Sequence, residues 1–595
     1  MSTNVGAEQS RYEALSYVWG DAVANTYILL NGVRVFVQRS LMVALRNLRR
    51  KNRPRRLWID ALCIDQGNYT ESGDQVACMP LIYQAAESTV MYLGEKSAST
   101  AMAINFIQQL CRLIESNPHS LLPMLQDPQY ALQWAALQDI LERSYWNRVW
   151  IVQEVAVSKR VIMIIGRHQL SFQSFKVVIN ALADCYMHKI HQFVHMPLPA
   201  LRINPVWAVL QARDHFQSRA RLDLAELLVL FLSSFSSDPR DKVFALYSLC
   251  ANEQRKNGKD AAKATIAEGK FPPTLDYSHT TEELFMLIIR YLATHAENLD
   301  ILSALNPIAA HRTLPSWCPD WRSPSPARLP SKTCWWNCAG NTKPELSFDL
   351  DRRVMTAKGF AVDSIRFIIS TDSIGFDGDW DTEIAKEVNR AGTSPYGNES
   401  SWRVALLDTI LLDAPAWVME KSYKAMEGSC ARLEGCCNCS CCRGECYVAG
   451  TGLAGRDQKR QGYGHRRDGQ YDIFSTWYPR RLLEDGLRPW LYPWWMQVKK
   501  GVTTPSVRNI AANRMFFFSV RGYMGLVPEG ARPGDNIIVL YGGRTPFCVR
   551  RVGGETGSSE KWRFVGDSYC HGIMAGEAMT EPRSKSGEER LFQFV

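Results

Sequence analysis

The sequence predicts an N-terminal α/β domain with a mostly parallel sheet, followed by a helical region and a small β-rich C-terminal module. Strand and helix patterns alternate over the first 170 residues, helical periodicity dominates residues 171–310, and short apolar runs separated by glycine turns return near the end. Strands that alternate with helices pair in parallel, because each helix carries the chain back across the sheet.

The N-terminal elements follow from local patterns. Asn31-Gly32 between two apolar runs predicts a type I′ hairpin. Ser40 is the expected N-cap of a helix over residues 41–50, whose apolar side chains recur every three or four positions. Pro80 is expected to kink a helix over residues 75–86 or to mark its start. The other expected elements are strands over 12–19, 57–59, 89–93 and 160–165 and helices over 101–114 and 131–141.

Composition and spacing predict five segments. They are the α/β domain (1–170), the helical region (171–310), an irregular connection with short strands (311–394), a Cys- and Gly-rich loop or insertion (395–475), and the β-containing module (476–595). In the second segment we expect helices over 172–183, 222–232, 242–249 and 281–296, and in the last we expect strands over 515–520, 536–541, 547–552 and 562–565.

The composition is that of a globular protein, with 595 residues, 46% of them hydrophobic and 22% charged. The charge balance of 69 basic and 60 acidic residues is only mildly basic. The one dense basic cluster, Arg49–Arg56, lies between a helix end and a strand start, so we interpret it as a solvated connection and expect no nucleic-acid partner. No apolar run is long enough to span a membrane and no signal peptide begins the chain, which predicts a cytoplasmic location.

Three segments place polar or acidic groups directly after apolar or aromatic runs. They are Ala14–Asp21 (ALSYVWGD), Leu57–Gln66 (LWIDALCIDQ) and Arg143–Glu154 (RSYWNRVWIVQE). Ligands of an open parallel sheet bind beyond the carboxyl ends of its strands, and the first two segments would end on that edge. Arg148, Gln153 and Glu154 of the third segment would lie there too if that segment crosses the same edge.

These segments resemble the signature motifs of the fungal heterokaryon incompatibility (HET) domain family. Residues 238–246, 314–317 and 569–578 look like segments found downstream in the same fungal proteins. The resemblance implies a role in non-self recognition, a form of innate immunity in which fusion of incompatible cells triggers programmed cell death. It also implies a fold distantly like Toll/interleukin-1 receptor (TIR) domains, some of which cleave NAD. The chain departs from the family pattern at Asp65, where Asn is more common, and at Pro80.

NAD cleavage needs a carboxylate to stabilise a cationic ribosyl centre and a flat apolar surface for the nicotinamide. Glu154 and Asp60 are the candidate catalytic carboxylates, and Arg148 is a candidate phosphate ligand. The full set of candidate ligand-binding residues is Trp19, Gly20, Asp21, Trp58, Asp65, Arg148, Trp150 and Gln153. NAD would be the substrate, and the sequence firmly implies no cofactor. It has no Gly-rich phosphate loop, so we expect no switching driven by ATP or GTP.

A purely structural interpretation stays open beside the catalytic one. Asp60 could cap a turn or pair with Arg148, Glu154 could pair with Arg143 or Lys159, and the tryptophans could belong to the core. The chain would then be an inert interaction scaffold or an inactive paralogue rather than a NAD glycohydrolase. In either case we expect regulation by protein partners or by self-association through the rest of the chain.

A run of cysteines in the fourth segment has the spacing of a metal site. Cys436, Cys439, Cys442 and Cys446 could hold zinc tetrahedrally through four thiolates, and the spacing is also similar to that of an iron–sulfur run. The surplus cysteines around them equally fit an oxidation-prone insertion without metal.

Overall fold

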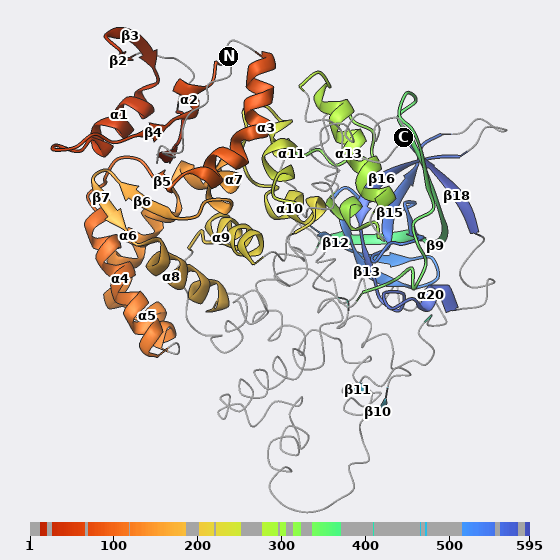
Figure 1. Ribbon diagram of the computed structural model, residues 1–595. Coiled ribbons are helices and arrows are strands. Elements are labelled where there is room, and N and C mark those ends of the chain that lie inside the picture. Colours follow the sequence, from red (N-terminus) through yellow and green to blue (C-terminus); the bar gives the residue numbers. More distant parts are fainter. Residues whose placement is uncertain are drawn as a thin grey trace, which may run out of the picture. The chain divides into compact units, whose positions relative to one another are not determined.

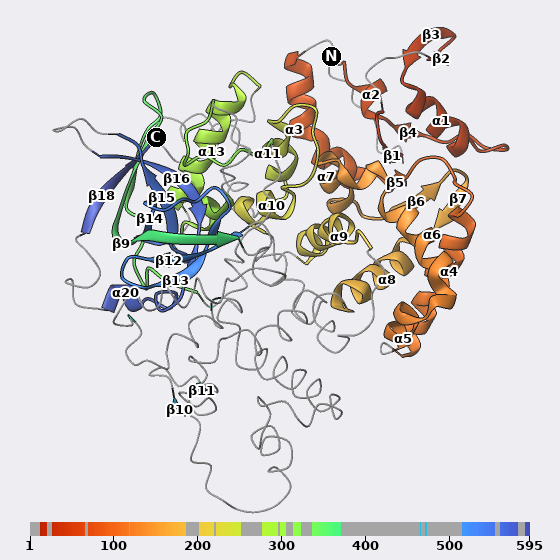
Figure 2. The ribbon, with the colours of Figure 1, turned by 180° about the vertical axis from the view of Figure 1, so that it is seen from behind.

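The computed structural model describes most of the chain in two compact units (Figures 1 and 2). The described residues are 12–20, 26–65, 69–117, 120–185, 201–218, 222–250, 277–295, 298–304, 313–322, 336–370, 514–553, 560–580 and 589–595, with a few positions between 395 and 472. Unit 1 comprises residues 1–185 and 197–291, and unit 2 comprises residues 186–196 and 292–595. The boundaries of the five segments stay a prediction.

The sheet of unit 1 has five strands in the order β4 (Leu57–Trp58), β1 (Glu13–Ser16), β5 (Ser88–Tyr92), β6 (Val161–Ile165) and β7 (His168–Leu170). The first four are parallel to their neighbours, and β7 is antiparallel to β6, so the sheet is mixed. The register places the carboxyl ends of β4, β1 and β5 at one edge.

Helix α7 (Trp150–Ala156) packs against β5, and helix α8 (Phe172–Asp184) packs against β6. The other helices described up to residue 295 are α1 (Arg39–Leu48), α2 (Asp60–Cys63), α3 (Tyr69–Ala85), α4 (Thr100–Ser116), α5 (Leu121–Gln126), α6 (Ala131–Leu141), α9 (Asn204–Gln217), α10 (Leu224–Leu230), α11 (Asp241–Tyr247) and α13 (Thr281–His295). None of the helices in the described ranges is long and apolar enough to cross a bilayer.

The predicted hairpin is present as β2 (Thr26–Leu30) and β3 (Val33–Val37). Asn31 and Gly32 have φ values of 53° and 84°, as a type I′ turn requires. The predicted cap at Ser40 is wrong. Helix α1 begins at Arg39, and the Ser40 hydroxyl instead donates a hydrogen bond to the carbonyl of Trp19.

Two further local predictions need correction. Pro80 lies inside α3, and the helix continues from Tyr69 to Ala85, so the proline does not mark its start. The region after residue 345 contains one long strand, β9 (Val354–Ser370), as well as short ones. Its Gly359 permits close approach of the neighbouring strand, since a Cβ there would lie 2.2 Å from the carbonyl oxygen of Val539.

The sheet of unit 2 forms around β9. Strand β14 pairs with both β15 and β9, so the hydrogen-bonded path through β15, β16, β18 and β9 returns to its start as a closed ring. The strands are β8 (Leu346–Asp349), β12 (Arg514–Ser519), β13 (Met524–Pro528), β14 (Asn536–Leu540), β15 (Phe547–Arg551), β16 (Lys561–Asp567), β17 (Tyr569–Cys570) and β18 (Glu589–Phe594). The unit also contains the 3-10 helix η7 (Asp300–Ala304), the short helix α20 (Glu577–Thr580), and the paired strands β10 (Gly464–His465) and β11 (Tyr471–Asp472).

Candidate active site

The three motifs meet at the carboxyl end of β1. The indole nitrogen Nε1 of Trp19, just after β1, donates a 2.8 Å hydrogen bond to Oδ2 of Asp60, just after β4. The guanidinium of Arg148 donates to the carbonyl oxygen of Tyr17. The first motif therefore contacts both of the others.

A second set of contacts lies directly behind this edge. The hydroxyls of Ser16 and Tyr145 share a 2.6 Å hydrogen bond, and the hydroxyl of Tyr83 on α3 donates to the carbonyl oxygen of Leu15 at 3.0 Å. All of these side chains are buried. Together they form a polar cluster inside the apolar layer between β1, α3 and α7.

Glu154, on α7, lies in this cluster. It is 2% exposed, and its Oε2 has no hydrogen-bond partner among the described residues. Burial raises the pKa of Glu154 to about 7; the positive charge of Arg148 opposes the rise, and the negative charge of Asp60 adds to it. The two candidate carboxylates are therefore close enough to influence each other's ionisation.

Asp60 begins the four-residue helix α2 and is 8% exposed. Its Oδ1 accepts a 2.7 Å hydrogen bond from the backbone nitrogen of Ala61. Burial raises the pKa of Asp60, although hydrogen bonds from Trp19 and Ala61 and the charge of Arg148 lower it. Asp60 is not the N-cap of α2, which is Ile59, and its carboxylate instead accepts hydrogen bonds from Ala61 and Trp19.

The hydroxyl of Tyr17 is a second buried atom without a hydrogen-bond partner in the described part of the chain. Burial raises its pKa, and the charges of Asp60 and Glu154 add to the effect, so the hydroxyl stays protonated at neutral pH. Buried polar atoms are nearly always paired with protein or with water. The Tyr17 hydroxyl and Oε2 of Glu154 therefore give the cluster one free donor and one free acceptor for a polar group.

Comparison with known proteins agrees with these motifs. Residues 12–154 match the family described as heterokaryon incompatibility protein (HET). The HET domain is thus the segment that contains all three motifs. Residues 496–587 match the Het-6 beta-barrel domain. The chain is 23% identical over 653 residues to "Heterokaryon incompatibility protein 6, OR allele" of Neurospora crassa, covering 95% of this chain and 89% of that protein. No solved structure matches the chain.

The tryptophans of the HET domain have different surroundings. Trp19 reaches Asp60, as described, and Trp58 packs edge to face on Tyr83 with ring centroids 5.5 Å apart. Trp150 lies at the start of α7, and its indole nitrogen donates to Oδ2 of Asp241 at 3.1 Å. The structure therefore gives Trp150 an anchoring contact with the segment after the HET domain.

The remaining candidates are dispersed. Gly20 has φ +77°, a conformation that favours glycine, so its described role is in the turn after β1. Gln153 is buried, and its Nε2 has no hydrogen-bond partner among the described residues. Asp65 is exposed at the end of its motif. Asp21 lies outside the described residues.

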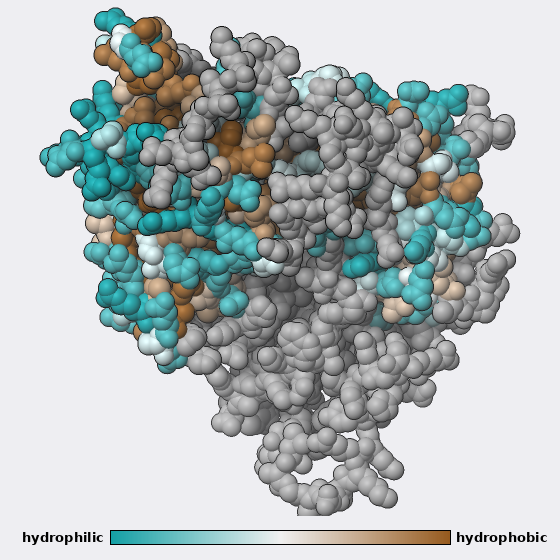
Figure 3. All heavy atoms as spheres, in the orientation of Figure 1, coloured by the Kyte–Doolittle hydropathy of each residue, from teal (hydrophilic) through white to brown (hydrophobic). Residues whose placement is uncertain are grey.

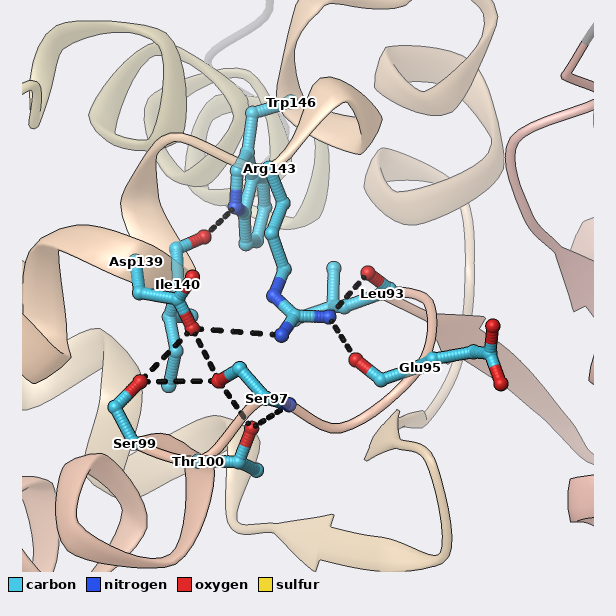
Figure 4. A network of polar contacts seen from close by, with 9 residues as sticks. All are labelled: Leu93, Glu95, Ser97, Ser99, Thr100, Asp139, Ile140, Arg143 and Trp146. Carbon is cyan, nitrogen blue, oxygen red and sulfur yellow. Dashed lines mark hydrogen bonds and ion pairs between the residues drawn. The ribbon is translucent and has the colours of Figure 1, made fainter.

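Arg143 does not pair with Glu154, contrary to one structural alternative. Its Nη1 donates to the carbonyl oxygens of Leu93 and Glu95, at 2.9 and 2.8 Å, and its Nη2 lies 3.6 Å from Asp139 (Figure 4). Arg143 thus ties the third motif to the loop after β5. Glu154 remains without that ion pair.

Sequence reasoning missed the hydroxyl groups of the cluster. Ser16, Tyr17 and Tyr145 lie within the recognised motifs, and Tyr83 lies in the helix between them. Ser16 and Tyr17 interrupt an apolar run, which is a pattern that could have identified them, whereas Tyr145 lies among polar residues. The four cysteines of the candidate metal site, Cys436, Cys439, Cys442 and Cys446, lie outside the described residues. Within those residues no group of three or more metal-ligating side chains occurs.

Proposed function

We propose that this HET-domain protein acts in fungal heterokaryon incompatibility and that its HET domain triggers cell death on contact with a non-self partner. The name of the Neurospora relative and the match along both units support the incompatibility role. The observation that carries the effector role is the convergence of all three HET motifs on Asp60, Arg148 and Glu154. Protein partners or further copies of the chain would control this activity in the cytoplasm.

The chemistry that we propose for the cluster is hydrolysis of NAD. Water adds to the ribosyl carbon and releases one proton to solvent while the bond to the nicotinamide nitrogen breaks, so nicotinamide and ADP-ribose are the products. Ionised Glu154 would stabilise the ribosyl cation, Asp60 would accept hydrogen bonds from ribose hydroxyls, and Arg148 would bind the diphosphate. The predicted distant likeness to TIR domains supports this chemistry by analogy alone.

An inert scaffold is the second candidate, and the burial of the carboxylates favours it. Asp60 is 8% and Glu154 is 2% exposed, so a dinucleotide reaches them only if neighbouring groups move. In a scaffold, the cluster would hold the three motifs together, and death would be triggered by whatever binds the outer surface. The two candidates differ in whether Glu154 itself is required.

Expression of the full chain in fungal cells separates the candidates. We expect growth arrest with a fall in cellular NAD for the wild type, and neither effect for Glu154→Gln at equal protein level. Glu142→Gln is the matched control, since Glu142 is exposed in the same domain. Growth arrest without NAD loss that is also seen with Glu154→Gln would contradict the enzyme and support the scaffold. Absence of arrest under every condition would contradict the effector role.

A further inference from the structure

The positive charge of this protein is concentrated in one short segment. Residues 26–59 contain no Asp or Glu and nine basic residues, as many charges as the whole chain's formal net charge of +9. The basic residues are Arg34, Arg39, Arg46, Arg49, Arg50, Lys51, Arg53, Arg55 and Arg56. All except Arg55, which is ion-paired with Glu13, are exposed.

The same segment carries an exposed apolar surface on the β2–β3 hairpin. One face of the hairpin packs on the core of unit 1 through Ile28, Val35 and Val37. The opposite face presents Tyr27, Leu29 and Phe36, which are 44%, 66% and 68% exposed. Beside the turn, Leu30 and Val33 are 45% and 65% exposed. Figure 3 shows this apolar surface at the upper left, above hydrophilic residues.

The charged and apolar parts are neighbours in the fold. Helix α1 directly follows β3 and contacts β2, and both views of the ribbon show them side by side (Figures 1 and 2). On the hairpin itself, the Arg34 guanidinium lies 4.9 Å from the ring centroid of Tyr27, which packs edge to face with Phe36. Aromatic, aliphatic and basic side chains therefore share one corner of unit 1.

We propose that this corner, the hairpin with residues 39–56, docks on a bilayer that contains anionic phospholipids. The apolar side chains would enter the boundary between headgroups and acyl chains while the basic side chains contact the headgroups, the combination by which peripheral proteins bind such surfaces. A nucleic acid would attract the charges but gain nothing from aliphatic Leu29 and Val33. A second copy placed face to face would bring two strongly positive segments together.

Vesicle sedimentation with the purified full chain tests this docking. We expect binding to vesicles of phosphatidylcholine mixed with phosphatidylserine, little binding to phosphatidylcholine alone, and a loss of binding as salt is raised. Binding that is equal for the two vesicle types, or absent from both, would overturn the proposal.

Two sets of variants test the two parts of the surface. Replacing Arg49, Lys51, Arg53 and Arg56 by Gln should weaken the partition coefficient about 100-fold or more, since each basic residue near an anionic surface contributes about fivefold. Leu29→Thr with Phe36→Thr should weaken it at least about tenfold through lost apolar burial. The controls are Arg352→Gln and Leu132→Gln, which alter a basic and an apolar residue exposed elsewhere.

The same variants exclude the other occupants. Full vesicle binding by both hairpin and basic variants would overturn the proposal. Failure to bind vesicles together with DNA binding that does not depend on Leu29 and Phe36 would also overturn it. A hairpin variant whose only effect is to convert a dimer to a monomer would overturn it as well. Unchanged unfolding midpoints in the variants show that any loss of binding reflects the surface and not the fold.

Discussion

At the scale of single residues, the proposed chemistry depends on Glu154. It is buried beside Asp60 and four hydroxyl-bearing side chains, and one of its oxygens has no hydrogen-bond partner in the described residues. Hydrogen bonds with the hydroxyls of Ser16 and Tyr83 lower the pKa of this carboxyl group, so Oε2 alone is unpaired, and burying an unpaired polar atom costs free energy. The unpaired oxygen of Glu154 is what we expect of a binding site, whereas the burial of the whole carboxyl group is what we expect of a scaffold.

The first prediction concerns the pH dependence of stability. Folding raises the pKa of Glu154 from 4.5 to about 7, so the folded chain binds this proton more tightly than the unfolded chain. This group thus makes the free energy of unfolding fall as pH rises from about 4.5 to about 7. Glu154→Gln has no such proton, and we expect it to gain stability over the wild type across that range, on the order of 3 kcal/mol.

Urea unfolding of the two proteins at pH 5 and pH 8 measures this difference. Glu142→Gln serves again as the control. Because Glu142 is exposed, its substitution should change the free energy of unfolding by nearly the same amount at both pH values. If Glu154→Gln changes the free energy of unfolding equally at both pH values, the Glu154 carboxylate is not desolvated in the folded chain.

At the scale of elements, α7 is tied to the segment that follows the HET domain. Asp241, in the first turn of α11, accepts hydrogen bonds from the indole of Trp150 at 3.1 Å and from the hydroxyl of Tyr277 at 2.7 Å. Burial raises the pKa of Asp241 to about 6, and both hydrogen bonds oppose the rise. Glu154 lies one helical turn after Trp150, so this anchor positions the helix that carries it.

The second prediction is that Asp241→Ala destabilises unit 1 by about 2 kcal/mol, because it leaves the Trp150 and Tyr277 donors without their acceptor. Asp214→Ala is the control, since that carboxylate forms a partly exposed ion pair with Lys176 that is worth little. Urea unfolding followed by tryptophan fluorescence gives both values. Equal effects of the two substitutions would contradict the anchoring role.

The elements also show what the sequence could and could not predict. The hairpin at Asn31-Gly32 and the helix α6 follow from local patterns, and they are present. Ser40 is not a cap, because its hydroxyl bonds to Trp19, a contact that depends on the tertiary fold. The length of β9 could not be predicted, since its residues are fixed by pairing with β8, β12, β14 and β18 rather than by a local period. In the site, the motifs identified Asp60, Arg148 and Glu154 but not the hydroxyls around them.

At the scale of the whole molecule, the chain consists of two compact units with separate cores. In unit 2, Arg514 and Asp567 form a buried ion pair at 2.5 Å, with side chains that are 1% and 5% exposed. Removing one partner of a buried pair leaves an uncompensated charge and costs about 3–5 kcal/mol.

The third prediction follows from this division. We expect calorimetry of the full chain to show two unfolding transitions, and Arg514→Ala to lower the temperature of one while leaving the other in place. The control Arg352→Ala disrupts an exposed pair with Asp349 in the same unit and should shift neither transition appreciably. A single transition that moves as a whole in Arg514→Ala would mean that the units unfold together.

The most direct test of the proposed effector role is nicotinamide release from NAD by the purified full chain. We expect turnover by the wild type that increases as pH rises through about 7, since ionised Glu154 is the active form. Glu154→Gln should lose this turnover, and Glu142→Gln should retain it. Turnover by Glu154→Gln equal to that of the wild type would contradict the assignment of Glu154 as the catalytic carboxylate.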